Sequence, residues 1–186
     1  MKTYIVVYDT FAQFEVVLSS YFLKEAGEIV TVGVTDEPAL AYEGFRTLPD
    51  MRIEDVNASD VDVLILPGGN PEKLYDCNAL YGLIRAVNER GKIIGAICSS
   101  PLHLGKAGIL KGRKYTVTPY HKGNEMLEPE NYIHQNTVID GNIITAQPSG
   151  YVDFAIDIGK MAGIYKDEAD LQETIDFFRE FKILEE

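Results

Sequence analysis

The sequence contains little cysteine and no long apolar segment. Only Cys77 and Cys98 occur among 186 residues, far too few for a disulfide framework. No stretch approaches the roughly 18 uninterrupted apolar residues that a membrane span needs. Residues 3–8 already look like a strand, and no basic segment with an apolar stretch and a cleavage site precedes them. We therefore expect a cytoplasmic protein without a secretory signal.

Positive charge is also scarce. The chain has 17 Lys and Arg against 29 Asp and Glu, a formal net charge of −12. Such a surface repels a phosphate backbone, so we expect neither nucleic acid nor an anionic membrane as a partner. Part of the acid gathers in residues 167–180, where it is typical of a solvated helix face.

Motifs that hold cofactors or metals are missing. There is no phosphate loop with lysine, no glycine triplet that opens a helix, and no cluster of His and Cys with metal-ligand spacing. We expect no cofactor and no metal, and a small molecule as the substrate.

The bulk composition fits one folded domain over residues 1–186. Hydrophobic residues make up 46% and charged residues 25%, the balance of a soluble globular protein. A chain of this length buries enough apolar surface around one core to be stable without a disulfide or a structural metal.

Apolar runs alternate with helical stretches along the chain. Runs suited to buried strands occupy residues 4–7, 29–34, 61–66 and 92–97, and helical stretches occupy 11–26 and 78–90. This order predicts an α/β fold, a mostly parallel sheet with helices on both faces.

Local signals predict several element boundaries. Thr10 and Gln13 read as a capping box for the first helix, and Gly27 ends it. Asp140-Gly141 predicts a hairpin between strands at 133–139 and 142–146, followed by helices at 151–161 and 168–181. Residues 34–62 are irregular, and we expect short edge strands or an excursion there.

Cys98 lies where a strand meets a helix. The strand ends at Ile97 and a helix over 99–107 follows, stopped by Gly108, with small residues on either side of the cysteine. A nucleophile elbow needs such a sharp turn. The start of a helix favours thiolate over thiol, and the Ser99 amide points where an oxyanion can form. The alternative is a buried, inert cysteine.

Glu15 stands on the apolar stripe of the first helix. Phe11, Glu15, Leu18 and Phe22 are spaced to share one helix face. A buried carboxyl there is either protonated or partnered, because an unpaired buried carboxylate is costly. The start of this helix and Cys98 are expected at the same sheet edge. The alternative is a glutamate that simply reaches solvent from the first turn.

Pro67-Gly68-Gly69 leaves the same edge of the sheet. Paired glycines let the backbone approach a ligand and turn its amides inward, which makes the Gly69 amide a second candidate oxyanion donor. A plain turn is the alternative.

These pieces together resemble the ThiJ/PfpI superfamily of class I glutamine amidotransferase-like domains. The matching segments are Glu15 twelve residues before Gly27 and residues 66–69, 96–101, 112–114 and 140–146. The resemblance implies a flavodoxin-like three-layer sandwich, usually a homodimer. It also implies that Cys98 is the nucleophile, that a protonated Glu15 hydrogen-bonds its sulfur, and that the amides of Gly69 and Ser99 bind the oxyanion.

The sequence departs from the superfamily in its histidines. Some members have His directly after the cysteine, where this chain has Ser99, and others have His where Thr118 precedes Pro119. The late His and Glu pair of glutamine amidotransferases is absent. His121 is therefore the one candidate for an assisting base, against the alternative of a surface residue. His103 and His134 look structural.

Three functions fit these residues. In the first, Cys98 attacks a small carbonyl or amide-like electrophile, as a hydrolase, an amidotransferase-like enzyme or an aldehyde-detoxifying enzyme, with Glu15 as proton shuttle. In the second, Cys98 is a redox sensor of a stress-response protein, oxidised to a sulfinate. The third is a ligand-binding module.

Overall fold

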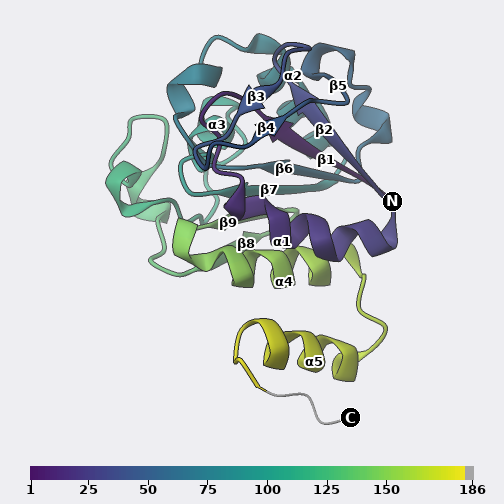
Figure 1. Ribbon diagram of the computed structural model, residues 1–186. Helices are drawn as coiled ribbons and strands as arrows, with labels where there is room; N and C mark the ends of the chain where they lie inside the picture. The colour runs from purple at the N-terminus through teal and green to yellow at the C-terminus, as the bar shows by residue number, and fades with distance from the viewer. Residues whose placement is uncertain (183–186) are drawn as a thin grey trace.

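The fold is a seven-stranded sheet with helices on both faces (Figure 1). The computed structural model describes residues 1–182. Its helices are α1 (Phe14–Leu23), α2 (Asn78–Glu89), α3 (Pro101–Lys106), α4 (Tyr151–Ala162) and α5 (Glu168–Phe178). Its strands are β1 (Lys2–Val7), β2 (Glu28–Gly33), β3 (Ala39–Leu40), β4 (Arg46–Thr47), β5 (Met51–Arg52), β6 (Val63–Leu66), β7 (Ile93–Ile97), β8 (Thr137–Asp140) and β9 (Ile143–Ala146).

The main sheet has the strand order β5-β2-β1-β6-β7-β9-β8. All neighbouring strands in it run parallel except β8 and β9. β3 and β4 form a separate antiparallel hairpin within the stretch that looked irregular in sequence. The predicted flavodoxin-like sandwich, with a mostly parallel sheet, is confirmed.

Alternate residues of the central strands pack into two cores. Val63 and Ile65 of β6 join Val16 and Phe154 on the face covered by α1 and α4. Their neighbours Leu64 and Leu66 pack into the core on the opposite face, with residues of α2 and α3. Successive side chains of a strand point to opposite faces, so a strand that is apolar throughout is stable only between two helical layers.

The strand order of the sheet changes direction at β1. β2 lies on one side of β1 and β6 on the other, and β7 follows β6. Ligands of open α/β sheets bind beyond the carboxyl ends of the strands at such a reversal. The segments that leave β1, β6 and β7 therefore converge at one edge.

The start of α1 differs from the predicted capping box. Thr10 has a φ of +73° and lies in a turn, and the helix begins at Phe14, with no side-chain bond from the local cap. The free amides of Gln13 and Phe14 donate instead to the Glu43 carboxylate, at 3.1 and 2.9 Å. A carboxylate from a distant hairpin thus replaces the local cap.

Other predicted elements are present with shorter bounds. The hairpin turn at Gly141 has a φ of +63°, as a two-residue turn after Asp140 requires, but its first strand starts at Thr137 rather than at residue 133. The helix after Cys98 begins at Pro101 and spans only six residues.

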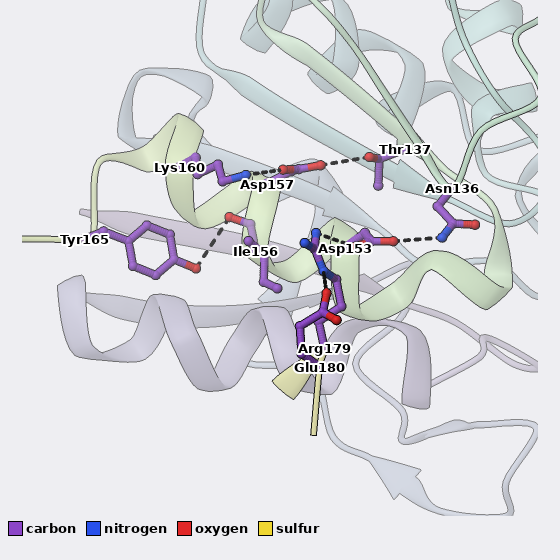
Figure 2. Close-up of polar contacts among 9 residues, drawn as sticks. All are labelled: Asn136, Thr137, Asp153, Ile156, Asp157, Lys160, Tyr165, Arg179 and Glu180. Carbon is purple, nitrogen blue, oxygen red and sulfur yellow. Dashed lines mark hydrogen bonds and ion pairs between the residues drawn. The ribbon is translucent and has the colours of Figure 1, made fainter. Parts of the chain in front are cut away.

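Hydrogen bonds and an ion pair connect α4 to β8, to the residue before it and to the residue after α5 (Figure 2). Asp153 accepts a hydrogen bond from Asn136 at 2.8 Å and pairs with Arg179, just after α5, at 3.3 Å. Asp157 accepts a hydrogen bond from Thr137 of β8 at 2.8 Å. α5 itself packs outside α1 and α4, where the Phe22 and Phe178 rings meet edge to face with centroids 4.9 Å apart.

Two further features concern the apolar residues outside the sheet and the lengths of the helices. An apolar cleft of about 760 Å³ lies between α1, α4, α5 and the β3–β4 hairpin, with Phe14, Tyr21, Phe45 and Phe177 among its walls. Within residues 1–182, no helix combines the length and apolar character that a membrane crossing requires.

Candidate active site

Cys98 occupies a sharp turn directly after β7. Its φ is +66°, a left-handed conformation that costs a residue other than glycine about 1–3 kcal/mol. Two backbone bonds hold it there: the Cys98 amide donates to the Ala146 carbonyl at 2.8 Å, and its carbonyl accepts from the Thr118 amide at 2.9 Å. The side chain remains partly exposed. This is the elbow geometry that the sequence predicted.

The two serines after Cys98 hold the turn in place through hydrogen bonds to the end of β6 and the segment after it. The Ser99 hydroxyl donates to the Gly69 carbonyl at 2.9 Å, and the Ser100 hydroxyl donates to the Leu66 carbonyl at 2.6 Å. Both side chains are buried. They tie the turn after β7 to the turn after β6, so the two segments hold a fixed relative position.

Glu15 lies in the first turn of α1 and reaches the cysteine. Its side chain is 2% exposed. One carboxylate oxygen accepts a hydrogen bond from the Gly68 amide at 2.7 Å, and the Cys98 sulfur lies beside the same carboxyl, close enough that each group shifts the pKa of the other. The structure thus brings the two predicted side chains together, and the buried carboxyl is partnered.

The glycine pair leaves no room for side chains. A Cβ on Gly68 would stand 2.7 Å from a Glu15 carboxylate oxygen and 2.8 Å from the Cys98 sulfur. Gly69 has a φ of +135°, a region that favours glycine. The amides of Gly69 and Ser99 lie near the Cys98 sulfur and lower the pKa of its thiol. The two amides predicted as oxyanion donors are therefore both near the Cys98 sulfur.

The pKa values of Glu15 and Cys98 differ from those expected for a resting thiolate. Burial raises the pKa of Glu15 to about 7, against the lowering effect of its bonds from Gly68 and Cys98. Burial first, and then the Glu15 charge and its hydrogen bond, raise the pKa of the Cys98 thiol to about 12, although the Ser99 and Gly69 amides oppose this. The sequence predicted a lowered thiol pKa, and the structure gives the opposite direction because the thiol is buried and a carboxylate is adjacent.

A carboxyl with a pKa near neutrality beside a thiol has the arrangement that a general base and its proton donor require. A base works best with a pKa close to the pH of operation. Near neutrality Glu15 can take the thiol proton as the sulfur attacks, while the surrounding amides stabilise developing negative charge. The site needs no resting thiolate for this.

The histidines lie apart from this pair. His121 ends a short turn after Thr118 and lines a cleft of about 560 Å³ with Asn70 and Tyr120; within residues 1–182 its ring shares no hydrogen bond with Cys98 or Glu15. His103 is buried, with Nδ1 3.1 Å from the Tyr81 hydroxyl, and His134 lies on the surface near Tyr132.

Sequence reasoning missed three contributors to the site. The Tyr8 hydroxyl donates to the Gly68 carbonyl at 2.9 Å and orients that turn. Gly68 gives its amide to Glu15, a role that the Gly-Gly pair alone could have suggested. Glu43 caps α1 from 29 residues away, and no local pattern marks that role. Across residues 1–182, no group of three His, Cys, Asp or Glu is arranged to hold a metal.

Comparisons with known proteins find a matching family and several similar chains. A model described as the DJ-1/PfpI family matches residues 1–161. The chain is similar to protein DJ-1alpha of Drosophila melanogaster, 36% identical over 78% of this chain and 70% of that protein. It is also similar to glutathione-independent glyoxalase DJR-1.2 of Caenorhabditis elegans, 31% identical over 78% of this chain and 80% of that protein.

Two further matches differ in how much of each chain they cover. An uncharacterised protein of Methanocaldococcus jannaschii is 33% identical over 67% of this chain, and the chain spans 62% of that protein. Among solved structures, the DJ-1 superfamily protein Atu0886 of Agrobacterium tumefaciens superimposes with a TM-score of 0.85 at 27% identity, covering 98% of this chain and all of the other.

Proposed function

The chain belongs to the DJ-1/PfpI family, and from this premise we propose that it is a cysteine-dependent enzyme that converts a small α-oxoaldehyde into a 2-hydroxy acid. The contact between Cys98 and Glu15 carries the proposal, because it pairs a nucleophile with a base of suitable pKa. The relative named a glyoxalase supports the choice of substrate class.

The proposed reaction starts with addition of the thiol to the aldehyde carbon. A bond forms between the Cys98 sulfur and that carbon, the thiol proton passes to Glu15, and the carbonyl oxygen becomes an oxyanion beside the amides of Gly69 and Ser99. Glu15 returns the proton to this oxygen. The product is a hemithioacetal.

Isomerisation and hydrolysis complete the sequence. Glu15 removes the proton on the former aldehyde carbon and delivers it to the neighbouring carbon, while the hydroxyl proton of the hemithioacetal passes to the ketone oxygen, which gives a thioester of a 2-hydroxy acid. Water cleaves the thioester and restores the Cys98 thiol. The aldehyde is oxidised and the ketone reduced within one molecule, so no external electron acceptor is required.

An amide hydrolase fits the site less well. Acyl transfer from an amide needs a proton donor for the nitrogen leaving group, usually a positioned histidine. Ser99 and Thr118 stand where relatives of that type carry His.

Turnover of methylglyoxal tests the proposal. We expect the wild-type chain to form lactate and Cys98→Ser to form none. Glu15→Gln should lose about 100-fold or more in kcat/KM, because the base is gone. His121→Gln should lose less than about tenfold, since its ring does not contact the pair. Cys77→Ser is the matched control and should retain full activity, because Cys77 packs against the core on the opposite face of the sheet from the core that Cys98 packs against.

A redox sensor is the second candidate, favoured by the position of Cys98, a half-buried residue, near two amides and a carboxyl. A sulfinate on Cys98 would accept from the same amides and from protonated Glu15. Absence of turnover with α-oxoaldehydes, glutamine and peptides, together with selective peroxide oxidation of Cys98 over Cys77, would replace the enzyme with the sensor.

A further inference from the structure

We propose that Glu43, at the tip of the β3–β4 hairpin, is a positioning residue for the Glu15 carboxyl. The inference deepens the proposed function and rests on it, because it assigns a further residue to the same Cys98–Glu15 pair. The observation that carries it is the pair of bonds from the Gln13 and Phe14 amides to the Glu43 carboxylate.

The first step is mechanical. Glu15 is the second residue of α1, so the orientation of the first helical turn sets where its carboxyl lies. That turn has no bond from a local cap, and the two amides that need acceptors find both oxygens of Glu43, at 3.1 and 2.9 Å. Loss of such a cap frays the turn.

The second step concerns how Glu43 is held. The hairpin folds back through a turn in which the Gly44 amide donates to the Ala41 carbonyl at 3.0 Å, and Gly44 has a φ of +87°. The Tyr42 amide donates to the Phe11 carbonyl at 2.9 Å, which anchors the tip against the loop before α1. Glu43 is therefore placed by its own backbone and not by chance contact of a flexible side chain.

The third step is electrostatic. Three titratable groups interact with the Glu15 carboxyl or lie against it: Cys98 on the elbow, Tyr8 at the end of β1, and Glu43 on the hairpin. The bonds from the α1 amides keep the pKa of Glu43 low, so it is charged at neutral pH. Its charge adds to the effect of burial and raises the pKa of Glu15. Glu43 thus helps to keep the base near neutrality.

The experiment measures alkylation of Cys98 by iodoacetamide against pH in a Cys77→Ser background. Glu43→Gln removes the charge and keeps one acceptor for the helix amides, whereas Glu43→Ala removes both. We expect both variants to move the inflection that belongs to Glu15 to lower pH by on the order of half a pH unit, because both delete the same exposed charge. Thermal unfolding should separate them, with Glu43→Ala the less stable.

Glu25→Gln is the matched control. Glu25 follows the other end of α1 with a side chain that is 81% exposed, so the same substitution there should leave the inflection in place. If the Glu43 variants lose stability but keep the wild-type inflection, Glu43 is only a cap and the inference is overturned. An inflection absent from the wild-type chain would instead refute the proposed role of Glu15, so the two failures are distinguishable.

Discussion

At the scale of single residues, the site depends on three positions where side-chain size or backbone conformation is exceptional. Cys98 adopts a left-handed conformation, and Gly68 and Gly69 approach other atoms too closely for a Cβ. Strain of this kind persists only where surrounding bonds enforce it. Here the Ser99 and Ser100 hydroxyls and the Ala146 carbonyl supply those bonds.

A methyl group at Gly68 is expected to separate Cys98 from Glu15. In Gly68→Ala the new Cβ would overlap both side chains, so we expect loss of about 1–3 kcal/mol in the free energy of unfolding and loss of the Glu15-dependent step in Cys98 alkylation. Gly82→Ala in α2 is the control. Its Cβ meets nothing within 4 Å, and it should stabilise the chain by about 0.5–1 kcal/mol. Urea unfolding measures both, and equal effects would contradict the close packing at Gly68.

The convergence of Cys98, Glu15, Ser99 and Gly69 could be predicted because each leaves a local mark in the sequence. A cysteine between a strand and small residues, and a glutamate on an apolar stripe, are visible in the sequence alone. The direction of the thiol pKa could not be predicted. It depends on how deeply the sulfur is buried and on the carboxylate beside it, both of which result from tertiary packing.

At the scale of elements, regular strands and helices were predictable and their connections were not. The central strands are apolar on both faces, and this pattern predicts a buried parallel sheet without further information. The start of α1 was misassigned because Thr10 and Gln13 imitate a capping box, whereas the real acceptor is Glu43. A cap supplied from a distant hairpin has no signature in the helix that it serves.

At the scale of the whole molecule, two buried titratable groups make stability depend on pH in opposite senses. The pKa of His103 is lowered to about 4 by burial and then by Lys106, so its contribution is present above about 6.5 and is lost as pH falls through 4. The pKa of Glu15 is raised from 4.5 to about 7, so its contribution is present below 4.5 and is lost as pH rises through 7.

Glu15→Gln should remove the second dependence. Glutamine imitates the protonated carboxyl at every pH, so the variant should gain stability relative to wild type by up to about 3 kcal/mol as pH rises from 4.5 to 7. Urea unfolding at several pH values measures the difference. The exposed Glu25→Gln control should give a constant difference, and a constant difference for Glu15→Gln as well would mean that its carboxyl is not desolvated.

The proposed chemistry depends on one proton that passes between the Cys98 thiol and the Glu15 carboxylate. The most direct test measures the rate of iodoacetamide alkylation against pH in a Cys77→Ser background, in which Cys98 is the one cysteine left to react. We predict a wild-type rate that rises with an inflection near pH 7, where Glu15 ionises, and a Glu15→Gln rate that has no inflection there. Identical profiles in the two chains, both following a free thiol near 8.5, would contradict the account.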